Sequence, residues 1–524
     1  MKKIATLIFL LTTCIQFANS QQTKFSKIYY DISAAKANAM AKTFDGGLIL
    51  CGNDESQLSV LRVDSLGDVL WAKKIGFTYD GTFNSLIRTT DSCFVLVGKI
   101  YNSLLLSYDI VIVKIDLSGA IIWTKVIEEN DSQEAMSIEE TYDGGFIVTG
   151  YEFISLIPNS HILVIKLDSQ ANVEWYNVLY GGNTANIGSI VKQLPDSSFV
   201  VGGGVEDSSI FDGKGYICSF SQTGVLQWTN FYNTSTPQNF TVNDLAIDSN
   251  GVFVYGSSES GSLFIFKIGF NGSLIWSKEI GNGIGRSNCI NCLTDKMRLL
   301  SNSELVFVTG STSISWPATL VNIDSSGTFN WAQYLDNSVY DVLEADDHGL
   351  FLLGSGPLLG VRTTTISQPH FGINKTDSLG NADICTSPYP PIILNSNVVT
   401  VNAVTMINVP RIVSSIVKVP VESTILFSTQ NSCVDFIGAI DENGFFPLEF
   451  YPNPSTASVI LKLKDVTGTV HVKVTDILGQ IVLEKKVDVS NENEIRFDHH
   501  LASGLYCVVA NASDKKFVGK MIVE

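Results

Sequence analysis

The chain has 524 residues, of which 52 are acidic and 34 are basic, and its formal net charge at neutral pH is −18. Nucleic-acid binding depends on clustered Lys and Arg that neutralise phosphates, so this composition argues against a nucleic-acid partner. Beyond the N-terminus, no stretch reaches the roughly 18 uninterrupted apolar residues that a transmembrane helix needs, so no transmembrane segment is expected.

The first twenty residues have the pattern of a secretory signal peptide. Lysines at positions 2 and 3 precede an apolar run at 4–11, and small residues at 18–20 offer a cleavage site. Residues 1–20 are therefore predicted to be a signal peptide, and the mature chain is expected to leave the cytoplasm.

A tryptophan recurs at nearly constant spacing through the following part of the chain. Successive members are 52, 52, 53, 48 and 55 residues apart, and they are Trp71, Trp123, Trp175, Trp228, Trp276 and Trp331. A fixed period of this length indicates a repeat architecture whose units stack on one another to bury their apolar faces. We expect the recurring ring to pack between neighbouring units; a ring of ligand-stacking aromatics is the alternative.

Each repeat contains four short segments rich in Val, Ile and Leu. In the third repeat they cover 135–139, 146–148, 161–167 and 173–179, and Asp, Gly, Ser and Asn separate them. This pattern predicts four antiparallel strands, which is the composition of one β-propeller blade. The Asp-x-x-Gly phrases are expected to be hairpin turns; a calcium loop is the alternative, but no repeat supplies the alternating carboxylates that such a loop needs.

The repeats can be counted from these phrases. The phrase or its equivalent occurs seven times, at Asp64, Asp116, Asp168, Ser221, Gly269, Asp324 and Asp377. The last repeat lacks its outer strand, and residues 25–29 read like the outer strands of the others, with Phe25 in the place of the tryptophan. An N-terminal strand that completes the last blade would close the ring. Residues 21–386 are therefore predicted to form a seven-bladed β-propeller.

The repeated phrase is similar to the tryptophan-docking repeat of quinoprotein propellers, although its Asp-to-Gly spacing is usually one residue shorter. The resemblance supports the propeller fold, and no quinone or other cofactor is expected.

The strand order of a blade places short turns on one face of the propeller and variable connections on the other. Variable loops on a rigid scaffold are where binding residues concentrate. Trp316, the tryptophan outside the repeat, lies in such a loop. It is a candidate anchor for a protein or carbohydrate ligand; a packed loop residue is the alternative.

Eight cysteines remain after removal of the signal peptide. In an exported protein disulfides are possible, and Cys385 with Cys433 is the pair that we expect to form one. Cys289 and Cys292 form a lone C-x-x-C, which is a weak zinc candidate. A loop disulfide or two free thiols is the preferred interpretation, and no metal site is predicted.

The rest of the chain differs in character. Residues 387–443 begin rich in proline and continue in β-favouring residues, so we expect a linker with some β-structure. Residues 444–524 contain about seven short alternating segments, which predict a small antiparallel, Ig-like β-sandwich.

This C-terminal part also carries a set of short motifs. Their residues are Pro452, Asn453 and Pro454 of Tyr-Pro-Asn-Pro, Asp476 and Gly479 of Asp-x-x-Gly, Gly504 and Tyr506 of Leu-x-x-Gly-x-Tyr, and Lys520 near the end. Together they closely resemble the type A C-terminal sorting domain of the type IX (Por) secretion system. The resemblance implies export by the type IX machinery to the medium or the outer cell surface of a diderm bacterium. An ordinary β-sandwich binding module is the alternative.

Three functions compete for the propeller. The preferred interpretation is a secreted or cell-surface module that binds an unknown protein or glycan without catalysis. A glycan-active hydrolase or lyase with its site in the propeller channel is the alternative; it would need a carboxylate pair, or a nucleophile with its base. Neither a Gly-x-Ser-x-Gly motif nor a histidine cluster occurs. The third is a purely structural role. No catalytic, cofactor-binding or metal-binding residue is predicted.

Overall fold

The computed structural model divides into two compact units, within residues 1–434 and 435–524. All secondary structure in the described residues is β-strand, which confirms the predicted all-β class. Among these residues we find no helix with the length and hydrophobicity required to span a membrane. The described residues are 24–30, 35–54, 57–76, 80–154, 159–180, 186–205, 214–234, 240–258, 262–280, 296–309, 318–335, 338–355, 371–382, 386–388, 394–396, 399–403, 407–411, 415–417, 421–424, 428–431, 445–451, 455, 458–463, 468–475, 481–489, 494–499, 501–502, 504–512 and 516–523.

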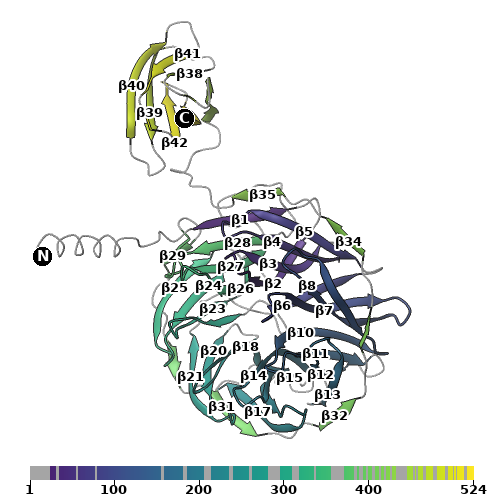
Figure 1. Cartoon of the computed structure of the whole chain (residues 1–524). Coiled ribbons are helices and arrows are strands. Elements are labelled where there is room, and N and C mark those ends of the chain that lie inside the picture. The colour runs from purple at the N-terminus through teal and green to yellow at the C-terminus, as the bar shows by residue number, and fades with distance from the viewer. Residues whose placement is uncertain are drawn as a thin grey trace, which may run out of the picture. The chain divides into compact units, whose positions relative to one another are not determined.

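The first unit is a propeller-like β-fold of seven sheets around a common centre (Figure 1). Four antiparallel strands form the body of each sheet, and in six sheets they are consecutive in the chain. The strands are β2 (Ala35–Lys42), β3 (Leu48–Asp54), β4 (Gln57–Val63) and β5 (Val69–Gly76) in the first sheet; β6 (Gly81–Arg88), β7 (Phe94–Asn102), β8 (Ser107–Ile115) and β9 (Ile121–Ile127) in the second; β10 (Ser132–Glu140), β11 (Phe146–Ile154), β12 (Asn159–Leu167) and β13 (Val173–Tyr180) in the third; β14 (Asn186–Gln193), β15 (Phe199–Val205), β16 (Lys214–Phe220) and β17 (Leu226–Thr234) in the fourth; β18 (Phe240–Asp248), β19 (Gly251–Ser258), β20 (Leu263–Ile268) and β21 (Leu274–Ile280) in the fifth; β22 (Met297–Leu299), β23 (Leu305–Thr309), β24 (Ala318–Ile323) and β25 (Phe329–Leu335) in the sixth; and β26 (Ser338–Glu344), β27 (Leu350–Ser355), β28 (Phe371–Thr376) and β1 (Phe25–Tyr30) in the seventh.

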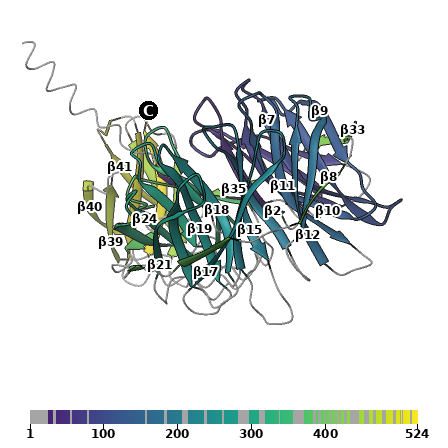
Figure 2. The ribbon, with the colours of Figure 1, turned by 90° about the horizontal axis from the view of Figure 1, so that it is seen from below.

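The sheets close into a ring. The first strand of each sheet contacts the first strand of the next, and β26 of the last sheet contacts β2 of the first. The N-terminal strand β1 completes the last sheet: it pairs antiparallel with β28, with Phe25 opposite Lys375 and Tyr29 opposite Phe371. The pairing predicted for residues 25–29 is therefore confirmed. Figure 2 shows the sheets from the side, with strands that run between the two faces of the ring.

The repeated tryptophan lies between neighbouring sheets. Trp175, on the last strand of the third sheet, stacks on Phe220 of the fourth at 6.0 Å between centroids and donates from Nε1 to the Gln222 carbonyl at 3.1 Å. The facing turn residue Gly224 has a φ of +81°, and a Cβ there would lie 2.8 Å from the indole. Phe25 of β1 takes the same place at the last junction, against Gly67. These contacts support the packing role predicted for the tryptophan.

The Asp-x-x-Gly phrases and their equivalents form hairpin turns, and the carboxylate belongs to the turn itself. The turn at Asp168 is such an equivalent, with Ala171 in the place of the glycine. Asp168 Oδ1 accepts hydrogen bonds from the backbone N–H groups of Gln170 at 2.9 Å and Asn172 at 2.8 Å. Although partial burial acts in the opposite direction, these hydrogen bonds hold the pKa of Asp168 below its ordinary value. The carboxylate is therefore engaged by backbone donors, as the hairpin interpretation requires.

A belt of short strands, which lie within residues 386–431, runs around the outside of the ring (Figure 1). The belt strands are β29 (Thr386–Pro388), β30 (Leu394–Ser396), β31 (Val399–Ala403), β32 (Ile407–Arg411), β33 (Ser415–Val417), β34 (Val421–Thr424) and β35 (Ser428–Asn431). They pair antiparallel with the outer strands of the sixth, fifth, fourth, third, second and first sheets in turn, and β35 pairs with β1. Every sheet thus gains a fifth strand that occupies its outer edge, and unpaired sheet edges are aggregation-prone.

One belt residue forms a buried ion pair with the ring. Arg411 of β32 donates to both carboxylate oxygens of Glu152, at 2.8 Å and 2.6 Å, and Glu152 is fully buried on β11. Burial raises the pKa of Glu152 to about 6 even though Arg411 acts to lower it, and Asp131 and Glu129 add to the rise. The bidentate contact joins the belt to the third sheet through a charge-assisted interaction.

The second unit is a two-sheet β-domain. Its strands are β36 (Phe445–Pro447), β37 (Glu449–Tyr451), β38 (Ser458–Lys462), β39 (Gly468–Thr475), β40 (Ile481–Val489), β41 (Glu494–Asp498), β42 (Gly504–Asn511) and β43 (Lys516–Val523). One sheet has the order β36-β43-β42-β39-β40, and the other has the order β37-β38-β41. All named pairs except β36 with β43 are antiparallel. Val459, Val472 and Phe517 lie in its hydrophobic core.

Candidate binding site

The innermost strands of the ring line a central channel, and a β-bulge at an equivalent place shapes it. Six of these strands shift register once, directly after Ala37, Phe83, Ala135, Gly188, Val242 and Val339. A bulge leaves one residue unpaired and re-aims its side chain. The unpaired residues are Asn38, Asn84, Met136, Ser189, Asn243 and Tyr340.

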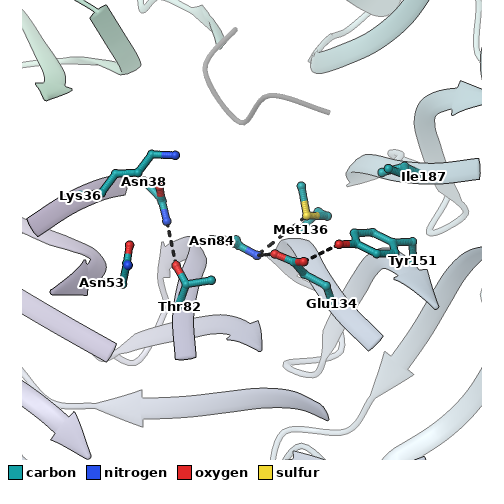
Figure 3. Close-up of a pocket in the computed structure, with 9 residues that line it drawn as sticks. All are labelled: Lys36, Asn38, Asn53, Thr82, Asn84, Glu134, Met136, Tyr151 and Ile187. Carbon is teal, nitrogen blue, oxygen red and sulfur yellow. Dashed lines mark hydrogen bonds between the residues drawn. The ribbon is translucent and has the colours of Figure 1, made fainter. Parts of the chain in front are cut away.

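A cavity of about 400 Å³ lies at the end of the channel where these strands begin (Figure 3). We call this cavity the mouth pocket. The strand order places it on the face of the longer connections. It is lined by Lys36, Asn38, Asn53, Thr82, Asn84, Glu134, Met136, Tyr151 and Ile187. Its volume is within the range of about 300–1,000 Å³ that is common for small-ligand pockets.

The two bulge asparagines of the mouth pocket are fixed by their amide nitrogens. Asn38 Nδ2 donates to the Phe83 carbonyl at 2.8 Å, and Asn84 Nδ2 donates to the Ala135 carbonyl at 3.0 Å. Each bond joins one sheet to the next and orients the amide. Because the nitrogens are committed to the protein, the Oδ1 oxygens are the acceptors that remain for the pocket.

Glu134 is a buried carboxylate whose acceptor capacity is largely used. It accepts hydrogen bonds from Asn84 Nδ2 at 2.8 Å, Lys99 Nζ at 2.6 Å and the Tyr151 hydroxyl at 2.5 Å (Figure 3). Burial, and then the charge of Glu134, raises the pKa of Tyr151 far above its ordinary value, so this hydroxyl stays a donor. The arrangement fixes Glu134 as a structural acceptor of the pocket wall.

Lys36 presents a cation at the rim of the mouth pocket. Its Nζ lies 5.7 Å from the centre of the Tyr340 ring, and within the described part of the chain we find no hydrogen-bond or ion-pair partner for it. Desolvation lowers the pKa of Lys36, and the charge of Glu134 opposes this effect only in part.

Deeper in the channel, an arginine bridges two buried aspartates. Arg298 donates to Asp244 at 3.2 Å and to Asp341 at 2.7 Å, and these residues come from three consecutive sheets. Asp244 also accepts from the backbone N–H of Met297 at 2.8 Å, and Asp341 accepts from that of Met40 at 3.3 Å. Burial raises the pKa of Asp341 although Arg298 opposes it. The carboxylates therefore serve as ties between sheets around a second cavity of about 450 Å³.

Most site residues predicted from the sequence fall outside the described residues. These are Trp316, Cys385, Cys433, Pro452, Asn453, Pro454, Asp476 and Gly479. Of the others, Gly504 begins β42, Lys520 lies in β43 opposite Cys507, and the Tyr506 hydroxyl donates to the Ala502 carbonyl at 2.7 Å. Tyr506 is thus a buried anchor of the second unit.

The sequence analysis missed the mouth pocket, although a signal for it exists. Asn38 and Asn84 each precede the aspartate of the next turn, Asp45 and Asp91, by seven residues. The same offset to an aspartate holds at the bulges of Met136, Ser189 and Tyr340, but not at that of Asn243. It identifies channel-facing residues only once the bulge is known.

Comparison with known protein families identifies the family of the C-terminal part of the chain. Residues 449–524 match the family described as the secretion system C-terminal sorting domain. The second unit is a type IX sorting domain. The resemblance stated from the motifs is thereby confirmed, and the chain is a secreted or cell-surface protein that the type IX machinery recognises.

Two solved structures that are similar to the chain share little sequence with it. No curated protein sequence matches the chain. A protein of unknown function from Dyadobacter fermentans DSM 18053 is 9% identical, with a TM-score of 0.36, over 68% of this chain and 98% of that one. A GH43_12 protein from a capybara gut metagenome is 8% identical, with a TM-score of 0.30, over 96% of this chain and 95% of that one. Similarity at this level carries no information on function.

Proposed function

We propose that the first unit is a seven-bladed β-propeller that acts as a non-catalytic binding module and that the mouth pocket is its binding site. In this proposal residues 1–20 are a signal peptide that is cleaved during export. The second unit, in this proposal an Ig-like sandwich, directs export. The observation that carries the proposal is the mouth pocket. It opens on the face of the variable connections, and it combines oriented amides with a lysine that has no hydrogen-bond or ion-pair partner among the described residues.

The state of the channel carboxylates supports binding over catalysis. A glycosidase needs one carboxyl group that donates a proton and another that acts as base or nucleophile. Glu134 instead accepts three hydrogen bonds, and Asp244 and Asp341 share one guanidinium. Trp316, in a connection on the same face, is proposed as a second anchor for the protein or glycan ligand.

A glycan array tests the binding role. The exported protein is expected to bind a subset of glycans and to release no product from them. Asn53→Ala, which changes the pocket wall, should reduce this binding without a change in melting temperature, because the Asn53 side chain is only half-buried. Tyr142→Ser is the matched control, since Tyr142 is exposed on the opposite, short-turn face. Release of product, or binding that only Tyr142→Ser reduces, would contradict the proposal.

The export role is tested by removal of residues 444–524. The truncated protein should accumulate in the periplasm, and mass spectrometry of the native surface protein should end upstream of Tyr451. Recovery of the intact C-terminus from the culture medium would instead indicate a retained domain.

A further inference from the structure

We infer that the mouth pocket recognises an acidic sugar, with Lys36 binding its carboxylate and the bulge asparagines binding its hydroxyl groups. This inference rests on the proposed binding function and adds the chemical class of the ligand. It requires a cation available to the ligand, acceptors for hydroxyl donors, and a pocket wall that is not dominated by apolar side chains.

Lys36 provides the available cation. Glu134, the other charged residue among the described residues that line the pocket, already pairs with Lys99 at 2.6 Å. Glu134 also accepts from Asn84 and Tyr151, so it has little capacity left for a further donor. Lys36 is exposed at the rim, so its ammonium is accessible, and a ligand carboxylate would form a charge-assisted hydrogen bond with it.

The asparagines provide the acceptors. Asn38 and Asn84 lie in adjacent sheets and are both held by bonds from Nδ2 to a neighbouring backbone carbonyl. Their Oδ1 atoms are therefore oriented acceptors, which match the hydroxyl hydrogens of a sugar ring. The half-buried amide of Asn53 and the hydroxyl of Thr82 add groups that can donate or accept.

The composition of the wall favours a sugar over the carboxyl terminus of a peptide. Of the nine lining residues only Met136 and Ile187 are aliphatic or thioether side chains, and Tyr151 is turned by its hydrogen bond toward Glu134 (Figure 3). A peptide terminus would need an apolar pocket for its last side chain, whereas a sugar presents hydroxyl groups on most of its edge.

The test is calorimetric titration of the exported full-length protein with oligogalacturonate and with the same oligosaccharide as its methyl ester. The free acid should bind at least about tenfold more tightly, as expected for loss of one charge-assisted contact. Lys36→Met should remove this preference and Lys36→Arg should retain part of it. The control Lys42→Met should keep it, because Lys42 lies at the far end of the same strand and pairs with Asp346 at 2.6 Å.

The outcomes separate this inference from the proposed function. Equal binding of acid and ester, unaffected by Lys36→Met, overturns the acidic-sugar inference but leaves a binding module for neutral glycans. Binding of a short peptide with a free carboxyl terminus, abolished by its amidation and by Lys36→Met, makes the ligand a protein and also overturns it. If none of these probes binds and the array shows no pocket-dependent ligand either, both the inference and the proposed function fail.

Discussion

The junctions between sheets and the mouth of the channel are built from the same repeat but use it in opposite ways. At the junctions one arrangement recurs, with an aromatic ring on the last strand of one sheet against a turn of the next, as in Trp175 with Gly224. At the mouth, equivalent positions two residues before each bulge hold Lys36, Thr82 and Glu134, which are chemically different. Repetition thus marks the residues that hold the ring. The varying positions form the wall of the mouth pocket, where Glu134 is held by its three hydrogen-bond donors and Lys36 remains for recognition.

The largest expected effect is on stability, and it tests whether β1 closes the ring. Removing residues 21–31 eliminates β1, including Tyr29, which is fully buried; it leaves the outer edge of β28 unpaired and removes the partner of the belt strand β35. We expect a loss of more than about 5 kcal/mol in the free energy of unfolding, because one large buried side chain alone contributes about 3–5 kcal/mol. Thermal melting measures it, and removal of residues 21–23 alone is the control. An unchanged melting temperature would refute closure by β1.

A glycine pair isolates the junction packing. Gly224 and Gly144 have nearly equal φ values, +81° and +79°, but a Cβ at Gly224 would lie 2.8 Å from the Trp175 indole, whereas nothing lies within 4 Å of one at Gly144. Alanine at either site costs about 1–2 kcal/mol for the left-handed backbone. Gly224→Ala should cost a further 1–3 kcal/mol or so, because the ring must move. Denaturant unfolding compares them, and equal losses would show that the indole contact is not what fixes this glycine.

The belt offers a smaller, pH-dependent effect. The pKa of Glu152 is raised from 4.5 to about 6, so the folded protein binds this proton more tightly than the unfolded chain. The contribution of this group to stability is therefore present below pH 4.5 and is lost as pH rises through 6. The loss amounts to about 2 kcal/mol. Glu152→Gln should remove this part of the pH dependence of unfolding; an identical slope in both proteins would contradict the assignment.

The smallest expected effect on stability is that of a substitution at Trp316, the proposed second ligand anchor. Trp316→Ala should change the free energy of unfolding by less than about 0.5 kcal/mol, as for most surface substitutions. If Trp316 is an anchor, ligand binding should weaken by about 2 kcal/mol or more. Calorimetric titration with the best array ligand measures the second quantity and thermal melting the first. Unfolding of the variant, or full retention of affinity, would exclude the anchor role.

The sequence predicted the elements that repeat. The tryptophan period predicted the repeated sheets, the Asp-x-x-Gly phrases predicted the hairpin turns, and the similarity of residues 25–29 to outer strands predicted the place of β1. Each is a local pattern with a fixed spacing, which can be read from the sequence alone. The sorting domain was predicted for a related reason, since its motifs are short and specific.

The belt and the pocket could not be predicted in the same way. Strands such as β29 and β33 have three residues each, without a shared motif, and their partners lie far away in the chain. Pairing of this kind leaves no periodic signal. The pocket depends on the bulges, which put Asn38 and Asn84 into the channel and are set by the pairing of whole strands.

The central claim, that the mouth pocket binds while the junctions only hold the ring, is tested most directly by hydrogen–deuterium exchange. The exported protein is measured with and without the glycan that binds it best on the array. We predict slower exchange in the first halves of β2, β6 and β10, which carry Lys36, Thr82 and Glu134, and no change at the junction turns around Gly224. Slower exchange confined to the short-turn face or to residues 444–524, with β2, β6 and β10 unaffected, would contradict the account.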